Sequence, residues 1–305
     1  MADMRAIDLF AGAGGFSEGA RMAGCRVVWA ANHWPAAVDT HAANHPGTEH
    51  ACQDLQQADW TTIPAHDLLL ASPACQGHTP ARGKERPHHD ACRSTAWAVV
   101  SALECHKPAF GIVENVPAFT RWQLFPAWCS ALHALGYAVA PHLVDCADLG
   151  VPQHRERVFI VLSRSRAPLH LNLLKVDHVP ASAIVDFNAG KWSPIERNGR
   201  ATATLARIIN GRKQHGDRFL SAFYGATKGG RGLNRPIGTI TTRDRWAVID
   251  GDRMRMLTVP EAKRAMAFRN DYRLPANSRD AMMMLGNAVP PLAARRIIEA
   301  VSAQA

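Results

Sequence analysis

Short apolar runs separated by helix-like segments occupy the first 165 residues, and they restrict the fold more than any other feature. The runs cover residues 6–10, 26–31, 67–71, 110–113 and 158–162. Between them, helix-like segments include 94–105 and 125–135. Continuous apolar strands that alternate with helices are typical of a mostly parallel sheet covered on both faces. We therefore predict an α/β fold with a ligand site beyond the carboxyl ends of the strands.

The pattern changes after Arg164, where periodicity weakens and the charge becomes strongly basic. Residues 164–279 carry 22 Lys and Arg against 9 Asp and Glu, whereas the rest of the chain carries 13 against 17, for a total of +9. A basic segment beside a mildly acidic one indicates a nucleic-acid-binding part joined to a different working part. Charge alone would also allow a basic surface that has no specific partner, as the alternative to a nucleic-acid-binding part.

Composition argues against several classes of protein. No stretch of about 18 apolar residues predicts a membrane helix, and the N-terminus lacks a secretory apolar run. The seven cysteines are odd in number, form no CxxC pair and all precede residue 147. They predict neither a disulfide framework nor a structural metal site. We expect a cytoplasmic protein without a bound metal.

A glycine-rich turn follows the first apolar run. Its residues are Phe10-Ala11-Gly12-Ala13-Gly14-Gly15. Glycines at a strand-to-helix turn let the backbone approach a ligand, and the helix N-terminus favours an anionic group. The spacing is not GxGxxG, which argues against a nicotinamide cofactor. A purely structural turn is the alternative.

Polar and aromatic residues follow the next elements along the chain. The second run ends at Asn32-His33-Trp34, where Trp34 could offer a face to an adenine ring. Asp54, followed by Leu55, could accept a hydrogen bond from the adenine amino group. Core packing of Trp34 and a surface role for Asp54 are the alternatives.

Reactive side chains follow two further runs. Cys75 lies just after residues 67–71, a location that suits an exposed thiolate nucleophile. Glu114 ends the next run, and the two residues face one pocket if their strands are neighbours. Arg155 and Arg157 lie two apart, so on a strand they would share a face and could bind a phosphate or a base carbonyl. Each residue alone also fits a structural role.

The motifs together resemble the DNA (cytosine-5) methyltransferase family over nearly the whole chain. They comprise the Phe10–Gly15 turn, Pro73-x-Cys75-Gln76, Glu114-Asn115-Val116, Gln153-x-Arg155-x-Arg157 and Gly286-Asn287-Ala288-Val289-Pro290. The resemblance implies a Rossmann-like class I methyltransferase domain, formed by residues 1–165 and completed by 278–305. It also implies a small target-recognition domain at 166–277, within the basic segment.

The resemblance further implies a reaction and its site. The enzyme would move a methyl group from S-adenosylmethionine to C5 of a flipped-out cytosine in a specific duplex DNA sequence. Cys75 would attack C6, Glu114 would engage N3, Arg155 would stabilise the base and Arg157 would hold the pocket. The donor site would comprise Phe10, Ala11, Gly12, Gly14, Gly15, His33, Trp34, Asp54, Leu55, Pro73, Asn287 and Ala288.

Two positions depart from the family pattern. His33 stands where the family usually has Glu, and Ala74 replaces the second proline of Pro-Pro-Cys. A modified sulfonium donor is therefore an alternative to S-adenosylmethionine. Methylation of RNA cytosine and a non-catalytic DNA-binding role are alternatives to the reaction itself.

The target sequence cannot be predicted from the chain, because base readout depends on side-chain geometry. Candidates for DNA contacts are Lys191, Trp192, Arg197, Arg200, Arg212, Lys213, Tyr224, Lys228 and Arg231. The resemblance implies a monomeric bacterial or phage-encoded protein. It does not separate a restriction system from an orphan role.

Overall fold

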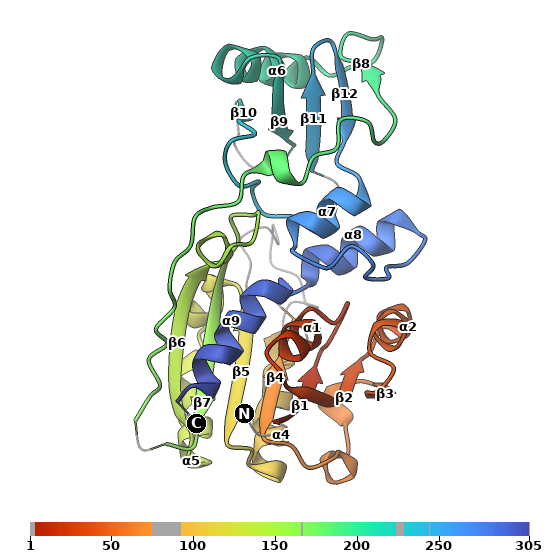
Figure 1. The fold of residues 1–305 in the computed structure, drawn as a ribbon. Helices are drawn as coiled ribbons and strands as arrows, with labels where there is room; N and C mark the ends of the chain where they lie inside the picture. Colours follow the sequence, from red (N-terminus) through yellow and green to blue (C-terminus); the bar gives the residue numbers. More distant parts are fainter. Residues whose placement is uncertain (1–3, 75–92, 166, 224–228, 244, 305) are drawn as a thin grey trace. The chain divides into compact units, whose positions relative to one another are not determined.

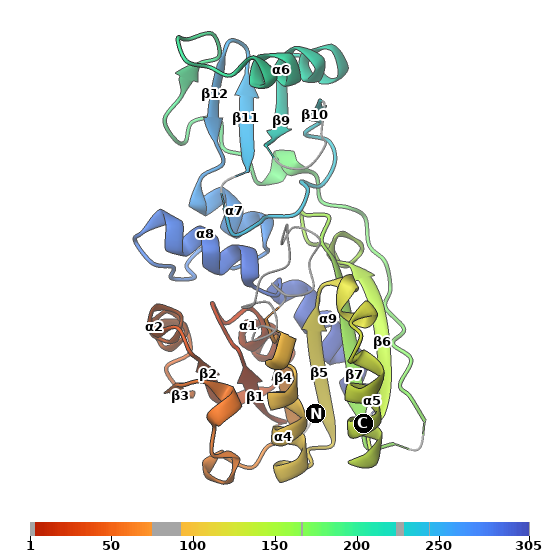
Figure 2. The ribbon, with the colours of Figure 1, turned by 180° about the vertical axis from the view of Figure 1, so that it is seen from behind.

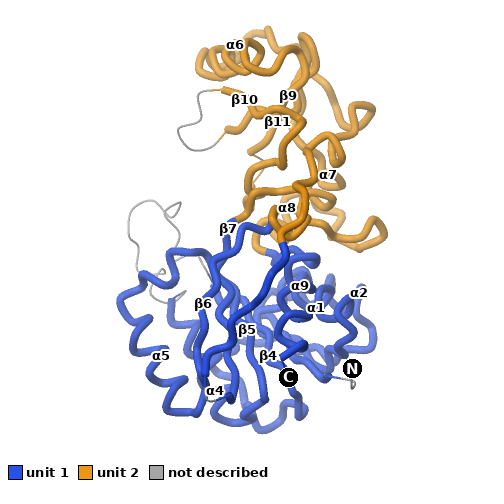
Figure 3. Tube along the Cα trace, turned by 60° about the vertical axis from the view of Figure 1, so that its left-hand side comes forward, with its two compact units in different colours: residues 1–146, 156–174, 288–305 blue, residues 147–155, 175–287 orange. Residues whose placement is uncertain are grey.

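The computed structural model describes residues 4–74, 93–165, 167–223, 229–243 and 245–304, drawn as solid ribbon in Figure 1. The chain forms two compact units (Figure 3). The first contains residues 1–146, 156–174 and 288–305, and the second contains 147–155 and 175–287. The sequence predicted a domain boundary at 165–166, whereas the structure divides the two units at 174–175. Helix α8 (Ser278–Asn287), predicted with the first domain, belongs to the second unit.

A seven-stranded sheet forms the centre of the first unit, in the order β3-β2-β1-β4-β5-β7-β6. Its strands are β1 (Arg5–Leu9), β2 (Arg26–Asn32), β3 (Glu49–Cys52), β4 (Leu68–Ala71), β5 (Phe110–Asn115), β6 (Ala138–Asp145) and β7 (Glu156–Ser163). The pairs from β3 to β5 are parallel, whereas β7 runs antiparallel to β5 and β6. The predicted mostly parallel α/β sheet is confirmed.

Helices cover both faces of this sheet. They are α1 (Gly15–Met22), α2 (Pro35–Asn44), α4 (Trp97–His106), α5 (Phe125–Ala134) and α9 (Pro291–Ser302). Helices α1 and α9 lie on one face, and α4 and α5 on the other, as a comparison of Figures 1 and 2 shows. Ile7 and Leu9 join the core cluster that also contains Val99 and Trp128 of α4 and α5. Because strand side chains alternate, Asp8 points to the opposite face, toward α1.

Two glycines let α1 and the C-terminal segment pack closely. A Cβ atom at Gly15 would lie 1.9 Å from the carbonyl oxygen of Val289, and one at Gly19 would lie 2.4 Å from Cβ of Ala294. Any side chain at either position would force the two segments apart. The end of the chain is thereby held against the helix that follows the glycine-rich turn.

The second unit is built on a five-stranded antiparallel sheet in the order β10-β9-β11-β12-β8. Its elements are β8 (Ser193–Pro194), α6 (Thr202–His215), β9 (Arg218–Ala222), β10 (Gly230–Arg231), β11 (Trp246–Asp250), β12 (Arg253–Met256) and α7 (Val259–Ala265), followed by α8. Helix α6 covers one face, where Ile208 packs with Phe219 and Ile249. The second unit therefore has a small hydrophobic core of its own.

A buried ion pair joins the other face of the small sheet to α7. Arg255 Nη2 lies 2.7 Å from Glu261 Oε1, and the two side chains are 1% and 0% exposed. Glu261 also accepts hydrogen bonds from the backbone N–H groups of Thr258 and Asp186. The carboxylate thus has several donors around it, as a buried ion pair requires.

No helix in the described part of the chain combines the length and the apolar character needed to cross a bilayer.

Candidate functional site

The sequence-predicted residues of the first unit gather at one edge of the large sheet. Strands β1 to β5 are parallel, so their carboxyl ends meet at this edge. The glycine-rich turn follows β1, His33 follows β2, Asp54 follows β3 and Pro73 follows β4. Glu114 is the next-to-last residue of β5. This edge is where open α/β sheets bind ligands.

The turn after β1 has an unusual backbone. Phe10, Gly12 and Gly14 have φ angles of 62°, 55° and 81°. A non-glycine residue with positive φ is uncommon and often marks a functional site. The Ala11 N–H donates to the Ala31 carbonyl at 3.0 Å and so ties the turn to β2.

The residues after β2 and β3 are also held by local hydrogen bonds. Asn32 Oδ1 accepts from the Trp34 N–H at 2.9 Å, and Trp34 precedes α2 as its N-cap residue. Asp54 Oδ1 accepts from the Gln56 N–H at 3.0 Å. His33 and Asp54 are exposed, Trp34 is half-buried and Leu55 is buried. A cationic nucleoside would thus meet exposed polar groups and one aromatic ring at this edge.

The chemistry of this edge fits S-adenosylmethionine. The nearest atom to a Cβ built at Gly12 would be the Phe10 carbonyl oxygen, 3.8 Å away, so the backbone is not crowded at this residue of the turn. An open backbone turn, an aromatic ring and a carboxylate are the groups that a nucleoside-containing ligand requires.

Hydrogen bonds fix the segment that leads to the predicted nucleophile. Asn115 Nδ2 donates to the Pro73 carbonyl at 3.0 Å, and the Ala74 N–H donates to the Thr95 hydroxyl at 3.1 Å. Asn115 is 1% exposed. Cys75 itself lies outside the described residues. Asn115 belongs to the Glu114-Asn115-Val116 motif, but the sequence predicted no role for it.

Glu114 pairs with Arg157 across neighbouring strands. Arg157 Nε lies 2.9 Å from Glu114 Oε1, with side-chain exposures of 12% and 7%. Arg157 Nη1 also donates to the Glu156 carbonyl at 2.7 Å. The guanidinium is therefore held beside a nearly buried carboxylate at the predicted edge.

Arg155 does not share this arrangement. Strand β7 begins at Glu156, so the two-residue spacing does not place Arg155 and Arg157 on one strand face. Arg155 belongs to the second unit. There its Nη1 and Nη2 donate to the carbonyls of Ile240 and Gly286 at 3.1 and 2.9 Å, and the residue is 1% exposed. It ties two backbone segments of that unit together.

The last two predicted donor residues fall on either side of the division between units. Asn287 is exposed and ends α8 in the second unit, whereas Ala288 is buried and begins the C-terminal part of the first.

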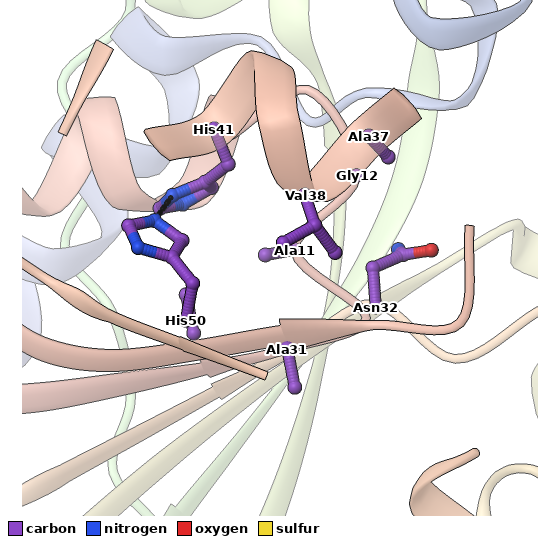
Figure 4. A pocket seen from close by; sticks show the side chains of 9 residues that line it. Ala11, Gly12, Ala31, Asn32, Ala37, Val38, His41 and His50 are labelled. Atoms are coloured by element: carbon purple, nitrogen blue, oxygen red, sulfur yellow. Dashed lines mark hydrogen bonds between the residues drawn. The ribbon is translucent and has the colours of Figure 1, made fainter. Parts of the chain in front are cut away.

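A row of hydrogen-bonded polar side chains, Asp8, Ser17, His41 and His50, lies next to the glycine-rich turn, and the sequence did not predict it. Asp8 Oδ2 accepts from the Ser17 hydroxyl at 2.7 Å, and Ser17 Oγ lies 2.9 Å from His41 Nε2. His41 Nδ1 lies 2.8 Å from His50 Nε2. Figure 4 shows the two histidines among the residues that line a small pocket, together with Ala11. The sequence feature that could have indicated these bonds is Asp8, a single carboxylate within an apolar strand.

Burial changes the acidity of this chain. Asp8 is 0% exposed, and burial raises its pKa to about 7, although hydrogen bonds from Ser17 oppose the shift. Burial, followed by the nearby His45 and His50, holds the pKa of His41 well below its usual range. Of these four hydrogen-bonded side chains, Asp8 is therefore the one expected to change charge near neutral pH.

The raised pKa predicts a pH-dependent contribution to stability. Folded Asp8 keeps its proton up to a pKa of about 7, whereas unfolded Asp loses it near 3.8. The folded state binds more protons across this window, so stability relative to Asp8→Asn falls as the pH rises from about 4 to 7. Roughly three pKa units correspond to at most about 4 kcal/mol. Urea denaturation of both proteins between about pH 4.5 and 7.5 measures the difference, and parallel curves would contradict the prediction.

Comparisons with known proteins place this sequence among relatives of similar length. Curated relatives include the type II methyltransferase M.HgiDI of Herpetosiphon aurantiacus, which is 29% identical over 94% of this chain and 90% of its own. The type II methyltransferase M1.HphI of Haemophilus parahaemolyticus is 28% identical over 97% of this chain and 86% of its own.

Solved structures share the fold at lower identity. A mutant of Spodoptera frugiperda DNMT2 matches with a TM-score of 0.70 at 16% identity and covers 98% of this chain and 99% of its own. The Entamoeba histolytica methyltransferase EhMeth matches with a TM-score of 0.70 at 17% identity, over 100% of this chain and 99% of its own. The predicted Rossmann-like methyltransferase fold is thus confirmed. The family model of the C-5 cytosine-specific DNA methylases matches residues 4–303, and because this match spans nearly the whole chain, the protein belongs to that family.

Proposed function

We propose that this DNA cytosine-C5 methyltransferase uses S-adenosylmethionine as donor, flips its target cytosine out of a specific duplex sequence and attacks it with Cys75. The observation that carries the proposal is the Glu114–Arg157 pair beside the Pro73 segment. It supplies a carboxyl group and a guanidinium at the strand edge where the chain continues to the cysteine.

The residues at the ends of β1, β2 and β3 would hold the donor. The Phe10–Gly15 turn would accept its amino-acid part, Trp34 its adenine and Asp54 the adenine amino group. His33 would meet the ribose hydroxyls, where a ring nitrogen can accept one hydrogen bond. When bound, S-adenosylmethionine supplies an electrophilic methyl group.

The reacting groups belong to the chain and to the base. The Cys75 thiolate adds to C6 of cytosine while Glu114 gives a proton to N3, so C5 becomes nucleophilic. C5 then bonds to the methyl carbon as the methyl–sulfur bond breaks, and the sulfur keeps that electron pair and leaves as a neutral thioether. A base then removes the C5 proton, the C5–C6 double bond re-forms, Cys75 leaves as thiolate and the N3 proton returns to Glu114. Covalent catalysis splits one difficult step into easier ones.

Arg157 is the arginine that we assign to the base pocket. Its guanidinium is held by Glu114 at 2.9 Å, where it can also reach a base carbonyl. Arg155, which the resemblance also places at the base, donates to two carbonyls of its own unit, and its contact with the base stays a prediction. We propose that Arg155 positions the second unit's backbone.

The second unit would contact DNA, as its charge indicates. Several candidates from the sequence already hold the unit together. Trp192 lies against Arg253 and Arg255, Arg200 donates to the Pro194 carbonyl and Arg212 to the Gly251 carbonyl. Lys191, Arg197 and Lys213 are exposed, Arg231 donates to the Pro236 carbonyl, and Tyr224 and Lys228 lie outside the described residues.

An acid-free segment is the strongest candidate for phosphate contacts. Residues 218–243 include Arg218, Lys228, Arg231, Arg235 and Arg243 but no Asp or Glu. Arg235 and Arg243 are exposed. We propose that these two side chains bind DNA phosphates, which position the protein without reading sequence.

The phosphate assignment predicts a change in salt dependence. Arg235→Ala and Arg243→Ala should each lower the slope of log affinity against log salt by about 1, because each variant releases one fewer counterion. Fluorescence anisotropy with a labelled duplex measures the slope. Arg26→Ala, at the amino end of β2, is the control and should leave it unchanged. Equal slopes for all four proteins would remove the assignment.

Relatives named type II methyltransferases favour a place in a restriction–modification system. We propose a cytoplasmic, monomeric enzyme, as the family resemblance implies.

The reaction is tested by product analysis. The purified protein is incubated with S-adenosylmethionine and unmethylated duplex DNA of mixed sequence, and the digested nucleosides are analysed by mass spectrometry. We expect 5-methyldeoxycytidine only when the donor is present, and sequencing of the modified positions would give the target site. A parallel incubation with tRNA separates the substrates, and methylated RNA without methylated DNA would overturn the DNA assignment.

A further inference from the structure

Four elements of the first unit contribute to one continuous hydrogen-bonded chain. Asp8 lies on β1, Ser17 on α1, His41 on α2 and His50 on β3. The three successive side-chain links measure 2.7, 2.9 and 2.8 Å. Asp8, Ser17 and His41 are at most 1% exposed, whereas His50 is half-buried. The chain thus leads from the buried carboxylate to the edge of the unit.

Proton counting gives this chain only two self-consistent polarities. With Asp8 ionised, Ser17 donates its one hydroxyl proton to Asp8 and accepts from His41 Nε2–H, and His41 Nδ1 accepts from His50 Nε2–H. With a proton on Asp8 Oδ2, each of these three bonds can run in the opposite direction. Both polarities keep the histidines neutral and all three bonds intact. A proton can therefore be exchanged between the two ends without opening the core.

The carboxylate also supports the glycine-rich turn. Asp8 Oδ2 accepts from the Ser17 N–H at 3.1 Å. Ser17 is the third residue of α1, and the N-cap residue Gly14 provides no side-chain hydrogen bond. Asp8 thus performs the capping role from another element. At the other end of the chain, His41 and His50 line the pocket beside Ala11 and Gly12 (Figure 4).

We infer that Asp8, Ser17, His41 and His50 form a proton-sharing chain that positions the donor turn and makes donor binding depend on pH. An ionised Asp8 caps α1 and places negative charge below the turn, which favours a cationic sulfonium. Protonation at Oδ2 removes that charge and reverses the three side-chain hydrogen bonds. The donor part of this inference rests on the proposed function, whereas the chain itself does not.

Other charged groups lie on the elements around these four residues, including the exposed Asp39 on α2 and the exposed Glu49 on β3. On α1, Glu18 pairs with Arg21 at 2.8 Å. Helix α9, which packs against α1, carries Arg296 and the pair Arg295–Glu299 at 2.7 Å. The neighbours of Asp8 in β2 and β4 are Ala30 and Leu70. His45 stacks 4.5 Å from His41, and Asp8 Oδ1 has no hydrogen-bond partner among the described residues.

Ring-nitrogen NMR tests the chain directly. In protein labelled with ¹⁵N-histidine, we expect His41 and His50 to exchange donor and acceptor nitrogens in one shared transition between about pH 5.5 and 8.5. The transition should be absent in Asp8→Asn and Ser17→Ala and present in Ser17→Thr, which keeps the hydroxyl. His66, a buried histidine remote in sequence, is the internal control. Independent titration of the two rings, or an unchanged transition in Asp8→Asn, would overturn the inference.

Calorimetry tests the link to the donor. S-adenosylmethionine should bind roughly fivefold more tightly above the transition than below it, the size of one charge–charge interaction. S-adenosylhomocysteine, which lacks the sulfonium charge, should show a smaller change, and Asp8→Asn should show none. A flat profile in the wild type, with the donor bound, would remove the positioning role. The absence of donor binding at any pH would contradict the proposed function. In that case the NMR transition would still show whether the four side chains share a proton.

Discussion

Replacing Cys75 by alanine is expected to lower methyl transfer by at least about 10⁴-fold, because loss of a covalent nucleophile removes the step on which the others depend. Cytosine C5 does not attack a methyl donor at a useful rate unless a nucleophile has added at C6. The same substitution should abolish the covalent adduct with a duplex that contains 5-fluorocytosine, since fluorine at C5 prevents the elimination that releases the thiol. Denaturing gel electrophoresis detects that adduct.

The structure supports this choice of cysteine through the residues that precede it. The Pro73 carbonyl is bonded to Asn115 and the Ala74 N–H to Thr95. These bonds fix where the backbone leaves the sheet, one residue before Cys75. A nucleophile gains most from such positioning when its approach to the base is set before the base arrives.

Cys52 provides a matched control. It is an exposed free cysteine and the last residue of β3 in the same unit. Cys52→Ala should retain both the adduct and the methyl transfer. If Cys75→Ala kept more than about 1% of the wild-type rate, or if Cys52→Ala lost the adduct, the assignment of the nucleophile would be wrong.

The sequence predicted the sheet where its strands are covered on both faces. Strands β1, β4 and β5 are central, and their residues read as continuous apolar runs. The edge strands β3 and β6 gave no such run, because they are partly exposed and carry residues such as Glu49 and His142. Edge strands are stabilised by one neighbour, which a pattern along the chain does not reveal.

The limits at the site have a similar cause. Residue order places Glu114 and the Pro73 segment at strand ends, but it does not show whether Arg155 and Arg157 belong to one strand. That distinction depends on where β7 begins. The hydrogen bonds that begin at Asp8 continue through Ser17 on α1 to His41 on α2 and His50 on β3, so the apolar run could indicate an unusual carboxylate but not these bonds.

Glu114→Gln is expected to reduce the single-turnover rate of methyl transfer by about 10²–10⁴-fold, the usual contribution of a positioned acid–base group. Glutamine has nearly the same shape and can hydrogen-bond the base, but it cannot give a proton to N3 and take it back. Donor affinity should not change, because the proposed contact is with the base. Rapid-quench measurement at saturating DNA separates this loss from weaker DNA binding.

Arg157→Met provides the partner variant, since it removes the guanidinium 2.9 Å from Glu114. If both side chains act on one base, the double variant should lose less activity than the product of the two single losses. Glu104→Gln, at an exposed position on α4, controls for the loss of a carboxylate elsewhere. A Glu114→Gln rate within about tenfold of the wild type, or fully independent losses, would leave the pair a structural ion pair and transfer the acid–base role to another group.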